Sequence, residues 1–308
     1  MQFLLVQLLA TVLVNAAVAL ITGALATQLW LSLSDEGAWQ DLQARLEGAT
    51  GIGLLASITG TLLSLWQASA TMADVALFDS GPALWVLFAD TAYGRFALTV
   101  LLLLTAASGL HFTLGRHRRS RGYLVAMLAM LVAVAACRVA TGHAAESGVI
   151  SVAAAVEFTH IVAMAMWFGV VIVAAWIVLP PMGRMPAPGN IAAYLACLSS
   201  LATAALAAVL ASGLYNAFRV LNTPAEVVST GYGWILLTKL CCVAIAMALG
   251  GWNRFIGFPA MLAEIDLQPR NSARFRAVRT VLRVESVVLL IVLLAAAVLT
   301  TNVPPASS

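Results

Sequence analysis

Apolar residues follow one another along the whole chain in runs of about twenty or more, separated by short polar segments. A run of this length crosses the hydrocarbon core of a bilayer as an α-helix. The pattern predicts eight spans, at residues 3–31, 50–72, 92–114, 122–141, 150–179, 191–215, 232–253 and 284–301. We therefore expect an all-α, polytopic membrane protein that is embedded in the lipid bilayer.

The composition strengthens this expectation. The chain has 308 residues, of which 62% are hydrophobic and 9% charged, whereas soluble domains carry about 25% charged residues. The four cysteines lie inside apolar runs without CxxC spacing, which argues against a disulfide scaffold or a zinc site. No phosphate-binding loop is present, so an ATP-driven pump is not expected.

Three polar loops predict the orientation. The segment "GRHRRSR" (115–121) carries four arginines, residues 254–283 carry six, and "PPMGRMPAPGN" (180–190) carries one. All three fall on the same side of an eight-span count, and basic loops stay in the cytoplasm. Both termini are therefore predicted to be periplasmic, and the net charge of +3 reflects topology rather than nucleic-acid binding. The segment 34–48 is predicted to form a short amphipathic helix at the inner interface.

A weak internal repeat is visible. The segments "GALATQLW" (23–30) and "GVVIVAAW" (169–176) share the spacing from glycine to tryptophan. Spans one to four and five to eight have the same sense, which indicates a parallel 4+4 duplication. The single membrane domain then consists of two four-helix halves, 1–141 and 142–308. The first half has Val14 or Asn15 where the second has His160, so the chemistry is expected in the second half.

The fifth span carries ionisable side chains. His160 lies ten residues after Ile150, which places it ~15 Å deep in a core ~30 Å thick. Ionisable groups at such a depth normally face a polar cavity. One helical face carries, at i, i+3, i+7 and i+10, the residues Glu157, His160, Met164 and Trp167.

These residue types suit copper. Imidazole binds copper in either oxidation state, and a thioether favours the cuprous ion. His143 lies in the outer loop, where copper arriving from outside meets it first. The predicted metal ligands are therefore His143, His160, Met164 and Glu157. A structural alternative is that His160 and Glu157 hydrogen-bond to each other or to neighbouring helices and fix the bundle.

Other charged residues in the membrane need partners. Lys239, the only lysine, and Arg138 lie in the same half of the bilayer as Glu157, so we expect pairing among these three. Glu285 lies close to the cytoplasmic end of the eighth span. For Glu285 we expect an interfacial ion pair with one of three nearby arginines, Arg254, Arg279 or Arg283.

Several segments together resemble a known family. They are "GHAA" (142–145), "H…WFG" (160–169), "SGLYNAF" (212–218), "GYGWILLTK" (231–239) and "VLRVESVVLLIVLLAAAVLTTNVPP" (281–305). The ordered set is similar to the copper resistance protein D family (CopD) and extends over most of the chain, most clearly from residue 140 onward.

The resemblance implies a bacterial inner-membrane protein with about eight spans that moves copper inward across the cytoplasmic membrane. Such proteins often work beside a periplasmic copper-binding partner, the C-type copper resistance protein. The paired histidines of the family map onto His143 and His160, and its Tyr-Gly…Lys element maps onto Tyr232, Gly233 and Lys239. The first half has no outer-facing histidine, so a second metal site is not expected there.

The leading hypothesis is thus a copper-binding membrane protein that takes part in copper import, homeostasis or resistance, and not an enzyme. The alternative is a b-type haem electron carrier, because transmembrane histidines can ligate haem. His111 and His143 are predicted near opposite faces and His160 between them, so no two share a depth. An intramembrane hydrolase is a third hypothesis, suggested by "ASGLH" (107–111), but adjacent helical residues do not face each other.

Overall fold

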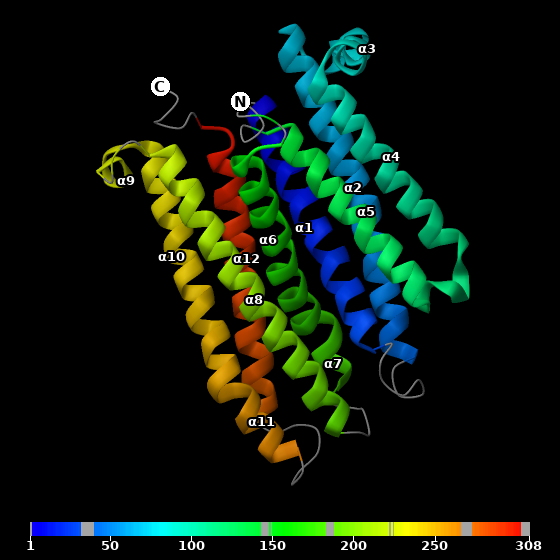
Figure 1. Ribbon diagram of the computed structural model, residues 1–308, viewed down its shortest axis with the longest axis vertical. Coiled ribbons are helices and arrows are strands. Elements are labelled where there is room, and N and C mark those ends of the chain that lie inside the picture. Colours follow the sequence, from blue (N-terminus) through cyan, green and yellow to red (C-terminus); the bar gives the residue numbers. More distant parts are fainter. Residues whose placement is uncertain are drawn as a thin grey trace.

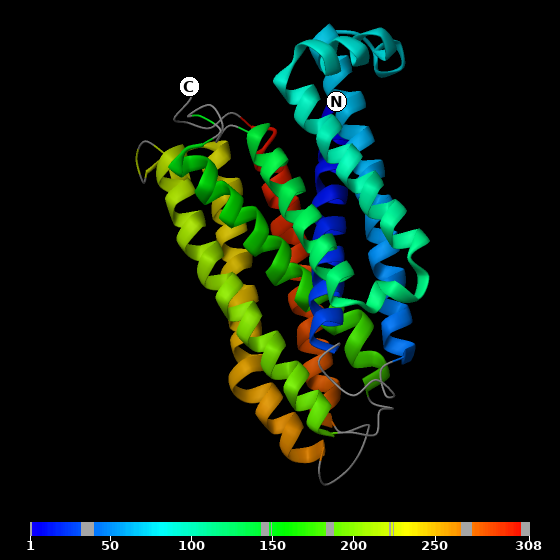
Figure 2. The same cartoon turned by 45° about the vertical axis from the view of Figure 1, so that its right-hand side comes forward.

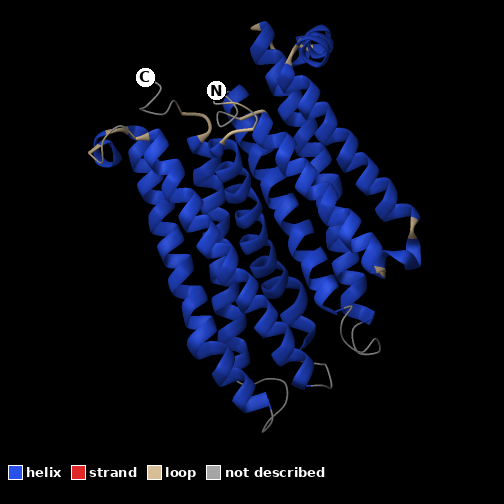
Figure 3. Cartoon of the chain, viewed as in Figure 1, coloured by secondary structure: helices blue, strands red, loops and turns tan. Residues whose placement is uncertain are grey.

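The computed structural model describes residues 2–31, 40–142, 148, 150–182, 188–221, 223, 225–265 and 273–302. Within them the regular elements are all helical, and eight helices are long and apolar enough to cross a membrane (Figure 3). The elements are α1 (Gln2–Leu31), α2 (Gln40–Ala73), η2 (Leu77–Asp79), α3 (Gly81–Asp90), α4 (Ala92–Thr113), η3 (Gly115–Arg119), α5 (Arg121–Ala140), α6 (Val152–Val173), η5 (Ala174–Val178), α7 (Leu179–Met182), α8 (Pro188–Val220), α9 (Glu226–Ser229), α10 (Gly231–Trp252), η6 (Asn253–Gly257), α11 (Phe258–Ile265) and α12 (Ala273–Leu299). The prediction of an all-α protein with eight spans is confirmed.

Successive spans run in opposite directions, as the eight-span prediction requires (Figure 1). Helix α1 begins and α12 ends at one end of the bundle, which we call the outer end (Figure 1). The turn η3 in the basic segment between α4 and α5 lies at the opposite, inner end. Which compartment each end faces stays a prediction from the positive loops.

Helix α1 lies at the centre of the bundle, between α2 on one side and α6 on the other (Figures 1 and 2). It carries no charged side chain. It packs closely on α6 because Gly23 and Gly169 face each other, and a Cβ on either glycine would overlap the backbone of the other helix. The division into halves 1–141 and 142–308 and the repeat both stay predictions, although the two glycines that meet here are the repeat-related ones.

The segment 34–48 does not form a separate interfacial helix where it is described. Residues 40–48 are the first turns of α2 and continue into its membrane span. Leu42 and Leu46 are fully buried, because their spacing of four residues places both on the face that packs into the core. The predicted start of the second span, residue 50, was therefore too late.

The segment 254–283 is also more helical than predicted. Helix α10 continues through the π-helical turn η6 into α11, and α12 already begins at Ala273. Phe275, Val278 and Leu282 are buried along one face of α12, so the arginines between them occupy the remaining faces of an amphipathic helix. A second π-helical turn, η5, follows α6. Helices α6 and α10 thus both change winding in the inner half of the bundle.

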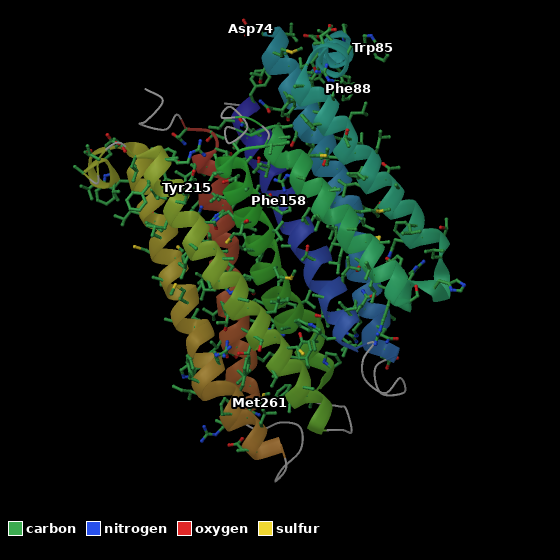
Figure 4. The ribbon with its side chains drawn as sticks, in the orientation of Figure 1. Asp74, Trp85, Phe88, Phe158, Tyr215 and Met261 are labelled. Carbon is green, nitrogen blue, oxygen red and sulfur yellow. The ribbon has the colours of Figure 1, made fainter. Side chains whose placement is uncertain are left out.

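At the outer end, α2 and the short helix α3 extend beyond the rest of the bundle (Figure 1). Figure 4 shows Trp85 and Phe88 on α3 there, with Asp74 at the end of α2. Trp85 is 76% exposed and Phe78 is 88% exposed. Aromatic side chains are enriched at the membrane surface, so this placement agrees with an outer interface at the level of α3.

Candidate functional site

A cavity of about 610 Å³ lies in the outer part of the bundle, chiefly between α1, α5, α6, α8, α10 and α12. Gly142 and Asn302, just after the last turns of α5 and α12, line it at the outer end. Phe168, which is 1% exposed, lines it at the inner side. The described charged residues in its wall are Arg138, Glu157, Arg219 and Lys239. These residues come from four different helices. Charged side chains that are far apart in the sequence therefore meet at this cavity.

His160 lies on the wall of this cavity, and α8 fixes its ring. Its Nδ1 atom is 2.9 Å from Ser212 Oγ, and the ring also bonds to the Val209 carbonyl. Since Ser212 Oγ donates its own hydrogen to the Ala208 carbonyl, the hydroxyl accepts from Nδ1. This arrangement favours the tautomer with the proton on Nδ1, which leaves the Nε2 lone pair for another partner.

Glu157 lies about one turn outward of His160 on the same face of α6. Its Oε2 atom accepts a hydrogen bond of 2.7 Å from Asn216 Nδ2 of α8. Glu157 also interacts electrostatically with Arg138 and Lys239. A carboxylate in this position therefore balances positive charge from two other helices.

Arg138 does not form the predicted ion pair. Its Nη2 atom donates to Asn15 Oδ1 at 2.6 Å, across 123 positions of sequence. Among the ion pairs of the described residues, none joins Arg138, Lys239 and Glu157. The three share one cavity and interact through its field, but the direct hydrogen bonds of Arg138 and Glu157 go to asparagines.

The Tyr-Gly…Lys element has two separate roles. Thr230 caps α10 by accepting from the Gly233 amide at 2.9 Å, and a Cβ on Gly233 would overlap the Glu226 carbonyl of α9. The glycine is thus needed for the turn that starts α10. Tyr232 and Lys239 both line the cavity, as expected for residues seven positions apart on one helical face.

Met164 lines the cavity, but Trp167 does not. Trp167 is 2% exposed, and its indole donates to Glu285 of α12. It lies ~10 Å further along α6 than His160, one residue before Phe168 of the cavity wall. Trp167 therefore contributes no wall to the cavity, and its supporting role beside the predicted metal ligands stays a prediction.

Glu285 also departs from its predicted surroundings. It is 2% exposed and accepts from Asn253 Nδ2 at 3.3 Å and from Trp167. None of the ion pairs in the described part of the chain involves Glu285. The predicted interfacial pairing with an arginine is therefore wrong, and two of the three arginines have other partners. Arg254 instead donates to Ser199 and Thr203 of α8, and Arg283 stacks on Trp176.

The described histidines do not converge on one site. His111 is buried near the inner end of α4, where Nδ1 lies 2.6 Å from the Tyr123 hydroxyl. Its ring also bonds to the Glu47 backbone, so it joins α2, α4 and α5. Of the histidines that the structure describes, His160 alone lines the cavity, so His111 and His160 do not form a bis-histidine haem site.

The remaining predicted ligand, His143, lies outside the described residues, as does Glu146. Within the described part of the chain, no group of three or more His, Cys, Asp and Glu side chains is arranged to hold a metal ion. The structure thus brings Glu157, His160 and Met164 together on one wall, with Tyr232 and Lys239 in the same cavity. Their role as metal ligands stays a prediction.

Several cavity residues were missed in the sequence. Asn15 and Asn216 each interrupt an apolar run, and a buried amide in a span usually has a partner on another helix. Ser212 looks like an ordinary small residue of a membrane helix. Cys137, which lines the cavity beside Arg138, lies in an apolar run like the other cysteines. The asparagines carried a usable signal; the serine and the cysteine did not.

Comparison with known families gives one result. Residues 192–299 match the family model described as Copper resistance protein D. The match covers the region from α8 to α12 and includes Ser212, Asn216, Tyr232 and Lys239, whereas His143 and His160 precede it. No curated protein and no solved structure matches the chain. The match agrees with the resemblance to the CopD family over this region, and the eight apolar helices agree with a multi-pass membrane protein.

Proposed function

We propose that the protein binds copper in the outer cavity and moves it inward across the membrane. The observation that carries the proposal is His160, held by Ser212 with Nε2 left for a ligand, on the wall of a 610 Å³ cavity. A neutral imidazole nitrogen is a common copper ligand. The CopD match over residues 192–299, which supply the α8 and α10 walls, supports copper as the cargo.

In this proposal His160 binds copper through Nε2, and Met164, one turn further inward on α6, supplies a thioether. Glu157 lies on the outer side of His160 and contributes negative charge or an oxygen ligand. His143 receives the ion first at the membrane surface and transfers it to His160. Imidazole with thioether suits the cuprous ion, which is therefore the oxidation state we expect inside the cavity.

The charge of the described cavity wall bears on how copper enters. Arg138, Arg219 and Lys239 are positive, and Glu157 is the one described carboxylate. A bare cation entering this wall meets repulsion, whereas a copper complex whose anionic ligands outweigh the charge of the ion meets attraction. We therefore expect the cargo to arrive as a complex with an anionic donor, delivered by a periplasmic copper-binding protein such as the C-type partner.

Copper stoichiometry tests the proposal directly. His160→Ala should abolish copper binding by the purified protein and the copper-dependent growth phenotype. His117→Ala is the matched control, since His117 is exposed in η3 at the inner end and should retain both. X-ray absorption of the copper-loaded protein should report nitrogen and sulfur ligands. If His160→Ala binds as much copper as the wild type, the site is wrong.

A further inference from the structure

A second group of polar side chains lies in the inner half of the bundle, away from the outer cavity. We call it the inner cluster: Trp167, Trp176, Asn253, Glu285 and Ser286. Glu285 comes eight residues before Leu293, the first α12 residue of the cavity wall, which is ~12 Å along the helix. Asn253 comes ~21 Å after Lys239 along α10. The inner cluster is therefore a separate site, and nothing in the proposed copper pathway uses it.

Helices that change their winding surround the cluster. Asn253 is the first residue of the π-helical turn η6, and Trp176 belongs to the π-helical turn η5. Both turns pack against α12, where Trp176 donates to Ser286 Oγ at 3.0 Å. Gly250 of α10 leaves room for the Glu285 carboxyl, since a Cβ there would lie 3.1 Å from Oε1. Single π-helical turns are frequent at functional sites.

The carboxyl of Glu285 has hydrogen-bond donors but no counter-ion. Its bonds come from the Asn253 amide and the Trp167 indole, and it joins no ion pair in the described part of the chain. An unpaired carboxylate enclosed by protein inside a membrane is costly. These surroundings therefore favour the neutral, protonated form of Glu285 over the carboxylate.

The charged groups on the neighbouring elements are engaged elsewhere. Arg254 of η6 is bonded to α8, and Arg283 lies 4.6 Å from the Trp176 ring centroid. Glu264 of α11 pairs with Arg274. Helix α1 has no charged residue. The four titratable groups that α6 and α10 contribute to the cavity are Glu157, His160, Tyr232 and Lys239. The other arginines of α12, Arg276 and Arg279, lie ~9 Å or more before Glu285 along the helix.

The hydrogen bonding of Asn253 is a second indication that Glu285 carries a proton. Its side chain is 1% exposed, its Nδ2 atom donates to Glu285, and its Oδ1 atom is buried with no hydrogen-bond partner. A protonated carboxyl and an amide can form two reciprocal hydrogen bonds, N–H to carbonyl and O–H to carbonyl. A proton on Glu285 would thus supply the donor that the Asn253 oxygen lacks.

We propose that Glu285 and Asn253 form a proton-binding site in the inner half of the membrane, and that its proton exchange is coupled to copper movement. The coupling rests on the proposed copper function, but the proton site does not. Exchange is an acid–base step in which Glu285 gains or releases H⁺ and nothing is oxidised or reduced. It would supply the driving force for which the sequence offers no nucleotide site.

Infrared spectroscopy of the purified protein tests the proton site without copper. At neutral pH the wild type should show the C=O stretching band of a protonated carboxylic acid, which disappears on titration to alkaline pH. Glu285→Gln should remove this band, whereas Glu264→Gln, at a carboxylate paired with Arg274, should keep it. Asn253→Leu should shift the band, because the carboxyl loses the donor and the acceptor that the Asn253 amide supplies. A wild type without the band, or a band that survives in Glu285→Gln, overturns the proton site.

Copper flux into proteoliposomes tests the coupling. A pH gradient should change the rate of copper uptake by the wild type and by Glu264→Gln, while Glu285→Gln should transport copper at a rate that no longer responds to the gradient. An unaltered response in Glu285→Gln overturns the coupling. If the wild type moves no copper at all, the proposed function and the coupling fail together, and the infrared result decides the proton site separately.

Discussion

The outer cavity and the inner cluster both place a carboxylate beside an asparagine inside a membrane, yet their surroundings differ. Glu157 accepts from Asn216 in a 610 Å³ cavity whose wall also carries Arg138 and Lys239. Glu285 accepts from Asn253 in a closed site where no described cation pairs with it. Charge is thus tolerated where space and opposite charge are present, and a proton replaces them where both are absent.

The two regions are divided at the level of Phe168. Immediately after it, Gly169 packs on Gly23 so closely that neither position can hold a Cβ without movement of the backbone. No space is thus left between α1 and α6 directly inward of Phe168. Copper that moves inward from the cavity therefore needs a route other than the interface of α1 and α6 at this level.

Replacing the glutamate by glutamine in each region should give the largest difference in stability between two variants. Glu157→Gln removes the negative charge that balances Arg138 and Lys239 and weakens the bond from Asn216. It should lower the free energy of unfolding by about 2.5 kcal/mol. Glu285→Gln imitates a neutral acid and should change it by less than about 0.5 kcal/mol. Denaturant titration in detergent micelles measures both.

A double-mutant cycle sharpens this contrast. If Glu157 acts as a counter-charge, its replacement should cost less in a Lys239→Gln background, and the coupling energy should exceed about 0.5 kcal/mol. The difference between the two regions is contradicted if Glu157→Gln and Glu285→Gln destabilise the protein equally.

Substitution at the contact between Gly23 and Gly169 should have the next largest effect on stability. Gly23→Ala forces a Cβ against the backbone of Gly169, and should destabilise the protein by about 2 kcal/mol. Gly109→Ala is the matched control, because a Cβ at Gly109 of α4 meets nothing within 4 Å. Thermal unfolding of the two variants compares them. Equal stability of the two variants would mean that α1 and α6 are not held together at this point.

Much of the architecture could be predicted from the sequence, because a membrane span is a single continuous run of apolar residues. Runs of apolar residues gave eight spans, and the basic segments between them gave the two ends of the bundle. The span boundaries were less accurate at α2 and α12, where amphipathic turns such as those of Leu42 and Phe275 extend the helices beyond the apolar run. The mean hydropathy of such turns is low because about half of their residues are polar, so they are not recognised as part of the span.

The site was predictable only in part, because helical spacing gives a face and a depth but not the neighbouring helix. Glu157, His160 and Met164 were correctly placed on one face, and all three reach the cavity. Trp167 lies on the same face but meets α12 instead. Glu285 is close in sequence to arginines, yet it bonds to Asn253, 32 positions away. Nothing local in the sequence distinguishes these partners.

The smallest expected effect concerns the serines that serve the two regions. Ser212 accepts from His160 and so orients the proposed copper ligand, whereas Ser286 accepts from Trp176 in the inner cluster. Both hydroxyls also donate to a carbonyl of their own helix, so the two Ser→Ala changes remove comparable bonds. Ser212→Ala should weaken copper binding about tenfold, because it loosens the imidazole.

Ser286→Ala should leave the copper affinity unchanged, since the inner cluster takes no part in binding the ion. Competition with a chromogenic copper chelator measures both affinities. Equal weakening in the two variants would mean that general loosening of the bundle, rather than the orientation of His160, lowers the affinity. No weakening in either would mean that Ser212 does not hold the ring in the orientation and tautomer that bind copper through Nε2.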